Sequence, residues 1–369
     1  MSTIPRCRRS FGQSSLAPGW PDFESPGSFE PKRWSAGGDE PVTGDYTLNS
    51  PGFLQRNLPH SRRGKANALT ILAAIAITII LSTTIPHFLR LGNILNILEQ
   101  LSILGFMSIG MTFVMVSGGI DLSTYTIVSA GSVVGATAMV SGGYSPLVGC
   151  FLMVLVGLAF GSINGVAIAF GRMIPFIVTL STMVVAQGFA IWFTQAQSIS
   201  GLPDSYVDAI SGKVFDVIPI PAIIIIAVAV IAGVILDRTQ YGRWLYLTGT
   251  NEAAARISGI PVRLTIFLAY LFSGLMAGIT AIVLTAMVGT ATTAMVRDER
   301  LMDVIATTVI GGASLKGGSG SVLGTMFGLL FITVLGNSFN LLGVSPFVAI
   351  VIKGAVLVMV IGLDVLRSR

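Results

Sequence analysis

The stretch LTGTNEAAARISGIP, residues 247–261, lies between two apolar runs, residues 218–236 and 264–288. Each run is close to the roughly 20 residues that a helix needs to cross a bilayer. The stretch itself predicts a short polar helix. Asn251 can accept hydrogen bonds from first-turn N–H groups, and Glu252 stands where the helix dipole favours an anion. We therefore expect a capped helix in water between two helices in a membrane.

The rest of this stretch continues and then ends the predicted helix. Three alanines, the best helix formers, follow Glu252, and Arg256 stands one turn after it so that the two can pair. Gly259 suits a left-handed stop, and Pro261 forbids continuation. Two interpretations stay open from these residues: a surface helix that only closes a loop, or a contact point for a partner. The residues in question are Asn251, Glu252, Ala253, Ala254, Arg256 and Gly259.

Composition places the whole chain in a membrane. Of its 369 residues 53% are hydrophobic and only 11% are charged, whereas a soluble domain carries about 25% charged residues. The net charge of +5 fits a bias of cytoplasmic loops, and no basic and aromatic motif for nucleic acid accompanies it. The two cysteines, Cys7 and Cys150, have no metal or redox spacing.

The apolar runs predict an all-α polytopic membrane protein with about ten transmembrane helices, some short or broken at Gly-Gly turns. The helical membrane domain is expected over residues 65–369, with its main polar loop at about 237–263. The predicted spans are residues 66–86, 94–116, 124–140, 147–170, 174–193, 218–236, 264–288, 301–310, 322–339 and 347–363.

Residues 1–64 differ in kind, because they are rich in Pro, Gly, Ser and mixed charge without apolar periodicity. Such a segment predicts a disordered tail; an alternative is that translation starts further downstream. Basic residues at the flank of the first run place the amino terminus inside. The carboxyl terminus and the 237–263 loop then fall on the cytoplasmic side as well. The loops assigned inside carry Arg172, Arg238, Arg243, Arg256, Arg263 and Lys316, and those outside Arg90, Lys213, Arg297 and Arg300.

Paired glycines mark three predicted turns, at Gly118-Gly119, Gly311-Gly312 and Gly317-Gly318. After the first turn, Asp121 either caps the following helix or lines a polar pathway. The loop at 311–320 does not form a nucleotide P-loop, because its lysine comes one residue too early for that motif. The chain is therefore expected to carry no ATP site of its own.

Ionisable residues inside apolar runs are costly and should face the bundle interior or a wet cavity. Asp303 and Lys353 could pair, although Lys353 could instead extend to the membrane surface. No catalytic or metal-binding constellation accompanies them, so we expect neither an enzyme nor a metal site. The candidates for a substrate pathway are Glu99, Gln100, Asp121 and Asp303.

Three motifs in this order resemble one family, the permease subunit of ribose/xylose/galactose-type sugar ABC importers, within the branched-chain amino acid/sugar permease superfamily. They are GGIDLS at 118–123, the loop from Tyr241 to Ile260, and the segment from Asp303 to Gly320. The resemblance covers about residues 66–366. It implies a subunit in the bacterial inner membrane that moves a monosaccharide into the cytoplasm.

The resemblance also implies partners: a second permease subunit, identical or different, two cytoplasmic ATPase subunits that bind ATP and Mg²⁺, and a periplasmic sugar-binding protein. The 251–259 helix would dock on the ATPase as a coupling helix. The chain departs from the pattern at Ser258, where a glycine is expected, and at Leu301, where an acid is expected. Two alternatives remain: an ion-gradient-driven secondary transporter, and an importer for another small polar solute such as a branched-chain amino acid.

Overall fold

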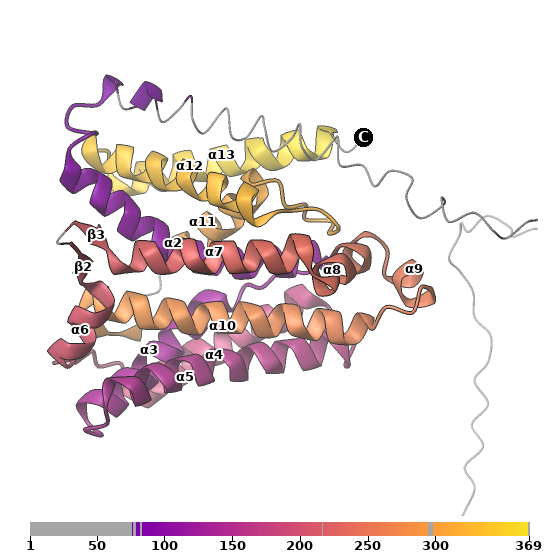
Figure 1. Cartoon of the computed structure of the whole chain (residues 1–369), viewed down its shortest axis with the longest axis horizontal. Coiled ribbons are helices and arrows are strands. Elements are labelled where there is room, and N and C mark those ends of the chain that lie inside the picture. Colours follow the sequence, from indigo (N-terminus) through magenta and orange to yellow (C-terminus); the bar gives the residue numbers. More distant parts are fainter. Residues whose placement is uncertain (1–75, 77–78, 82, 216, 294–297, 368–369) are drawn as a thin grey trace, which may run out of the picture. The chain divides into compact units, whose positions relative to one another are not determined.

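The computed structural model describes residues 76, 79–81, 83–215, 217–293 and 298–367. The chain divides into two units, residues 1–57 and 58–369, and every described residue belongs to the second. The tail predicted over residues 1–64 lies outside the described residues. Figure 1 shows the helices of the second unit.

The described fold is a helical bundle with four two-residue strands. Its long helices are α2 (Leu91–Val116), α3 (Thr124–Val140), α4 (Pro146–Ala169), α5 (Pro175–Thr194), α7 (Ile220–Arg238), α10 (Val262–Val288), α11 (Asp298–Ile310), α12 (Val322–Leu341) and α13 (Pro346–Arg367). The shorter helices are α6 (Asp204–Ser211), α8 (Gln240–Thr250) and α9 (Glu252–Ile257).

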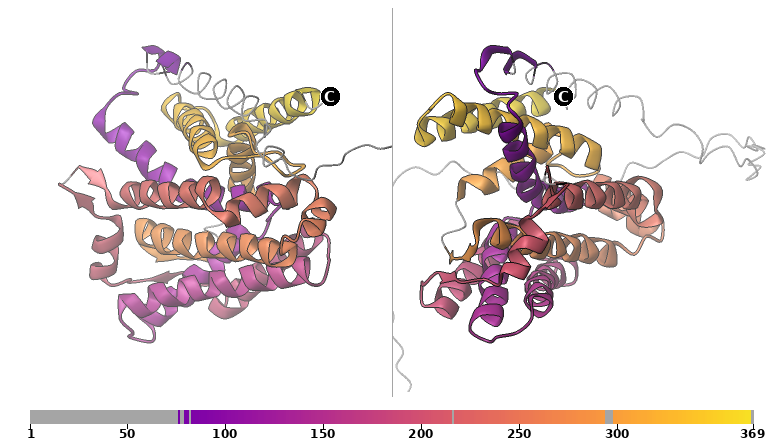
Figure 2. Two further views of the ribbon diagram at one scale, coloured as in Figure 1. Left: turned by 45° about the vertical axis from the view of Figure 1, so that its right-hand side comes forward. Right: turned by 60° about the vertical axis from the view of Figure 1, so that its left-hand side comes forward.

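Helix α2 forms the centre of this bundle. Every residue from Ser102 to Val116 is buried, and the helix packs against α7, α10, α11 and α12 (Figure 2). By contrast α4, α5 and α7 bury less than a third of their most apolar window and expose large side chains such as Phe151, Val184 and Val230. Apolar surface on that scale suits contact with lipid rather than water.

Glycines allow α4 and α10 to cross at backbone contact. A Cβ added to Gly274 would overlap the carbonyl oxygen of Gly157 and lie 2.9 Å from the Cα of Gly161. Helices in a membrane gain little from burying apolar side chains against each other, so close backbone packing through small residues supplies much of their attraction. The α4–α10 crossing is therefore one of the contacts that hold the bundle together.

Small strands and α6 close the end of the bundle opposite α9 (Figure 1). Strands β1 (Ile199–Ser200) and β4 (Thr290–Ala291) pair antiparallel, as do β2 (Lys213–Val214) and β3 (Ile218–Pro219). The buried Tyr206 of α6 donates a hydrogen bond to the carbonyl oxygen of Ile282 at 2.6 Å. Burial raises the pKa of the Tyr206 hydroxyl above its usual range, so the group stays protonated and able to donate.

Nine of the predicted spans coincide with helices, from α2 to α13, and the first, 66–86, falls mostly outside the described residues. Six described helices are long and apolar enough to cross a membrane, so the chain is an all-α polytopic protein, while the predicted number of about ten is not confirmed. Both predicted Gly-Gly interruptions coincide with helix ends, because α2 ends at Val116 and α11 at Ile310. Helices α6 and α8 were not predicted.

The α4–α10 crossing yields a stability prediction. Gly274→Ala should destabilise the folded protein by about 1–3 kcal/mol, because the added methyl forces two backbones apart. The measurement is the melting temperature of the detergent-solubilised chain. Gly188→Ala in α5 is the matched control, because nothing lies within 4 Å of a Cβ at that position. Equal melting of the two variants would contradict the proposed crossing contact.

Candidate functional site

Helix α9 has the local structure that its residues predict. The Asn251 side-chain oxygen accepts a hydrogen bond from the Ala254 N–H at 3.0 Å, which confirms the cap. Glu252 and Arg256 form an ion pair at 2.5 Å, as predicted. Gly259 has φ +78°, whereas Ser258 before it has an ordinary φ of −76°. The left-handed stop therefore needs its glycine at 259, and the serine at 258 costs the turn nothing.

The surface of α9 faces away from the bundle. Its expected contact residues are all exposed, and only Ala255 is buried, so one narrow face holds the helix to the protein. Ile257, 89% exposed, stands at the end of the helix. In Figure 1, α9 projects beyond the ends of α7 and α10. An exposed ion pair beside an exposed isoleucine offers both charge and apolar contact to another protein.

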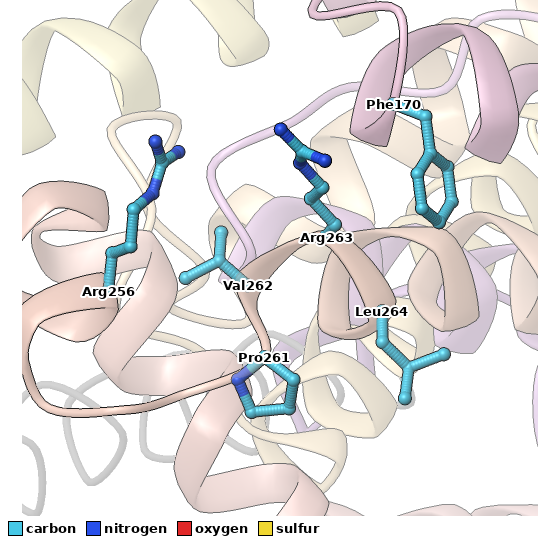
Figure 3. Close-up of a pocket in the computed structure, with 6 residues that line it drawn as sticks. All are labelled: Phe170, Arg256, Pro261, Val262, Arg263 and Leu264. Carbon is cyan, nitrogen blue, oxygen red and sulfur yellow. The ribbon is translucent and has the colours of Figure 1, made fainter.

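A shallow depression of about 380 Å³ lies where the polar loop enters α10. Arg256 and Arg263 extend their guanidinium groups to the same side of it, with Val262 between them (Figure 3). Phe170, at the end of α4, and Leu264 add apolar surface. The depression is complementary to a surface that is acidic at its edge and apolar at its centre.

The glycine turns lie at the end of the bundle from which α9 projects. Gly118, Gly312, Gly317 and Gly318 have φ between +72° and +89°, values that L-residues with a Cβ rarely adopt. Gly119 does not have a positive φ; a Cβ there would overlap the Tyr270 hydroxyl. At Gly311, similarly, a Cβ would lie 2.6 Å from the backbone of Gly324. In the pairs 118–119 and 311–312 one glycine thus turns the chain and the other admits a neighbour, whereas Gly317 and Gly318 each do both.

Three chain segments meet at backbone contact at the end of the bundle from which α9 projects. They are residues 116–118, 246–250 and 317–320, and we call them the glycine junction. The Gly318 N–H donates to the Val116 carbonyl oxygen at 2.9 Å. A Cβ on Gly249 would overlap that same oxygen and lie 2.6 Å from the Gly318 nitrogen. The segments 246–250 and 317–320 lie within two of the sequence motifs and the segment 116–118 leads into the third, so the fold brings the three motifs together.

Asp121 is fully buried beside the junction and holds four elements together. Its Oδ1 accepts hydrogen bonds from the backbone N–H (3.0 Å) and hydroxyl (2.6 Å) of Ser123, and its Oδ2 accepts one from Ser273 of α10 at 2.7 Å. Asn164 of α4 donates to the Ser123 hydroxyl and accepts from Thr182 of α5. We call these five residues the Asp121 network.

The network decides between the two interpretations of Asp121. Ser123 directly precedes α3, and Asp121 accepts a hydrogen bond from its backbone N–H, so Asp121 satisfies a backbone donor at the start of that helix, as the capping interpretation expects. Its oxygens are occupied by three donors, and its side chain is inaccessible to solvent. The geometry shows a clamp between the 117–123 loop and α4, α5 and α10.

The four candidates for a substrate pathway do not form one cluster. Glu99 and Gln100 are half-buried in the first part of α2. From Glu99 to the end of that helix is about 26 Å at 1.5 Å per residue, which separates both residues from Asp121. Asp303 lies on α11 and pairs instead with Lys353 of α13 at 2.8 Å, as the sequence allowed. Leu301, where the family pattern places an acid, is buried.

Within residues 83–215, 217–293 and 298–367, no three His, Cys, Asp or Glu side chains gather in a way that could hold a metal ion. Several residues of the glycine junction and the Asp121 network had no role assigned from the sequence, among them Asn164, Thr182, Tyr246, Gly249 and Ser273. Only Gly249 carries a signal that could have identified it, because an isolated glycine in a helical pattern often marks close backbone approach. The partners of the others are too distant in sequence to be read from it.

A family model described as "Branched-chain amino acid transport system / permease component" matches residues 93–361. The ribose import permease protein of Bacillus subtilis is 40% identical over 298 residues, covering 80% of this chain and 92% of the relative. That of Escherichia coli K12 is 33% identical, with the same shares covered. The D-allose transport system permease protein of the same strain is 32% identical, covering 81% of this chain and 91% of the relative. No solved structure matches the chain.

The Asp121 network predicts a loss of stability on isosteric replacement. Asp121→Asn replaces one accepting oxygen by an NH₂ group that cannot accept from its former donors. We expect destabilisation of about 1–3 kcal/mol, measured as a lower melting temperature in detergent. Asp208→Asn, at an exposed site on α6, is the control and should melt as the wild type. A melting temperature equal to that of the wild type for Asp121→Asn would refute the clamp.

The Asp303–Lys353 pair yields a second prediction, tested by a double-mutant cycle. Each single replacement, Asp303→Asn or Lys353→Met, leaves a partly buried charge without its opposite and should lower the melting temperature. Together they remove both charges, and the double variant should lose less than the sum of the two. The expected coupling is about 1 kcal/mol; additive losses would show that the pair contributes nothing.

Proposed function

Because the chain belongs to the family of permease components of branched-chain amino acid transport systems, we propose that it is the membrane-spanning subunit of an ABC importer for a monosaccharide. The relatives named for ribose and D-allose match it over most of their length. Ribose and allose are close in chemistry, a pentose and a hexose rich in hydroxyl groups. The solute class is therefore a simple sugar.

The observation that carries this proposal is the projecting helix α9. It is built as a rigid contact point, with a cap, an ion pair and a left-handed stop, and it exposes both charge and Ile257. A subunit without a nucleotide motif has to receive the energy of ATP hydrolysis from a partner. In this proposal Asn251, Glu252, Ala253, Ala254, Arg256 and Gly259 dock on a separate ATPase that binds ATP and Mg²⁺.

Charge supports placing α9 in the cytoplasm. The helix ends and loops at the α9 end of the bundle carry more Lys and Arg residues than those at the opposite end. Cytoplasmic loops are enriched in Lys and Arg. The cations at the α9 end are Arg172, Arg238, Arg243, Arg256, Arg263 and Lys316, and those described at the other end are Arg90, Lys213 and Arg300. We propose on this basis that the chain lies in the bacterial inner membrane with its amino and carboxyl termini on the cytoplasmic side.

The opposite end of the bundle then faces the periplasm. Helix α6 and the two short sheets form that surface, and a periplasmic sugar-binding protein is the partner that we propose for it. A second permease subunit, identical or different, completes the translocation path, and a second ATPase completes the motor. ATP-driven closure of the ATPases would push α9 and open the bundle outward.

The polar candidates divide between two roles in this mechanism. We assign Glu99, Gln100 and Asp303, which are half-buried on α2 and α11, to contact with a hydroxyl-rich solute. Asp121 has no free access to solvent, and we assign it to positioning. An ion-gradient carrier would need a relay of ionisable groups. The separation of Glu99 from Asp121 along α2 does not favour a relay through these two residues.

Removing the charges of α9 tests the proposal directly. The variant Glu252→Ala/Arg256→Ala should keep its melting temperature, because an exposed ion pair contributes at most about 1 kcal/mol. Its ATP-dependent sugar uptake should fall about tenfold, because two interface charges that meet the partner are lost. The assay is ribose uptake into proteoliposomes that contain the chain with its ATPase and its binding protein.

Arg90→Ala, at an exposed site on the opposite end that lies outside α6 and the two short sheets, is the control and should transport at the wild-type rate. Undiminished uptake by the double variant would refute the docking role of α9. Uptake driven by a proton gradient without any ATPase would instead establish the secondary transporter.

A further inference from the structure

We propose that Tyr246 and Gly249 are positioning residues that pass a displacement of α9 to two helical hairpins, α2–α3 and α11–α12, through the glycine junction. This inference rests on the proposed function, because it concerns how energy received at α9 reaches the spans. It assigns a transport role to two residues that lie outside α9 itself.

The connection between α8 and α9 is too short for α9 to move independently of α8. Asn251 alone separates the two helices. Its backbone N–H closes the last turn of α8 on the Leu247 carbonyl oxygen at 3.1 Å, and its side chain caps α9. One residue with both ends bonded cannot act as a flexible linker, so a displacement of α9 moves α8 as well.

Helix α8 in turn contacts the loops of both hairpins, α2–α3 and α11–α12. The Tyr246 hydroxyl donates to the Gly320 carbonyl oxygen at 2.7 Å. Gly249, three residues later and therefore on the same side of the helix, lies against Val116 and Gly318 at distances that admit no side chain. The loops also bond each other through Gly318 and Val116. Movement of α8 therefore displaces both loops together.

The α11–α12 hairpin carries the displacement as one body. A Cβ on Gly324 would overlap the Gly311 carbonyl oxygen, and one on Gly328 would overlap that of Thr307. Two helices in backbone contact over more than one turn do not slide independently, because their packed surfaces interlock. Asp303, the candidate for contact with the solute, lies on this hairpin.

The α2–α3 hairpin carries the displacement of α9 to helices α4, α5 and α10. Beyond Gly118 the Ile120 carbonyl oxygen accepts hydrogen bonds from Thr179 of α5 at 3.3 Å and Tyr270 of α10 at 3.4 Å. The Asp121 network then ties the same loop to α4, α5 and α10. The glycine junction is thus connected to the α11–α12 hairpin and, through the α2–α3 loop, to α4, α5 and α10.

The test removes a single hydroxyl. Tyr246→Phe keeps the ring and removes the hydroxyl that donates to the Gly320 carbonyl oxygen. The full-length chain is reconstituted with its ATPase and binding protein, and ribose transported and ATP hydrolysed are measured together. We expect the ATPase to bind and hydrolyse as in the wild type, and the ratio of ribose to ATP to fall about twofold to tenfold, the range of one hydrogen bond. A merely structural role would lower the melting temperature without changing this ratio.

Tyr241→Phe is the matched control on the same helix. Its hydroxyl donates to the Thr265 carbonyl oxygen on α10 at 3.3 Å, outside the junction, so the ratio should stay at the wild-type value. Gly249→Ala, in which a methyl overlaps the Val116 carbonyl oxygen, should reproduce the loss where it folds. An unchanged ratio in Tyr246→Phe, or an equal fall in Tyr241→Phe, would overturn the proposal.

Hydrogen exchange on the purified chain tests the same mechanics without partners. Tyr246→Phe should speed exchange of the amides of both loops, residues 117–123 and 311–321, and Tyr241→Phe should not. Faster exchange in 311–321 alone would overturn transmission to α2–α3. Absence of ATP-dependent uptake by the wild type would refute the proposed function, and the exchange result would still decide whether the junction couples the two loops.

Discussion

Backbone atoms that approach each other without intervening side chains are the contacts on which this structure depends. Inside a membrane the burial of apolar side chains against other helices gains little over their burial in lipid, so helices associate by close packing and by hydrogen bonds. The chain has 43 glycines, and those at the α4–α10 crossing, at the α11–α12 pair and at the glycine junction admit another backbone within contact distance. Replacing such a glycine changes the spacing of two helices at once.

Buried polar groups supplement this packing at the α9 end of the bundle. A carboxylate without partners in such a place is costly, and Asp121 has three donors from two elements. Because each member of the Asp121 network holds the next, the loop between α2 and α3 has little freedom to move alone. The junction and the network lie on the same loop, and together they make it a rigid connection between α9 and the three spans α4, α5 and α10.

Features that depend on short-range interactions could be predicted from the sequence. The cap at Asn251, the pairing of Glu252 with Arg256 and the stop at Gly259 involve residues within one or two turns of each other, so their spacing alone is enough. The ends of α2 and α11 could likewise be predicted from the paired glycines that come after them. The pairing of Asp303 with Lys353, by contrast, joins residues 50 positions apart; it could be named as an option but not chosen over extension to the membrane surface.

By itself the sequence determined the helical membrane class, the positions of nine helices, the local structure of α9 and the family. These depend on composition, on periodicity and on contacts between near neighbours. Only the tertiary structure decided that Asp121 clamps four elements, that Glu99 lies far from it, and that Tyr246 and Gly249 join three motifs at one point. The reason is that a side chain's distant partners are set by how helices cross, and crossing geometry depends on packing between residues that are tens to more than a hundred positions apart in the chain.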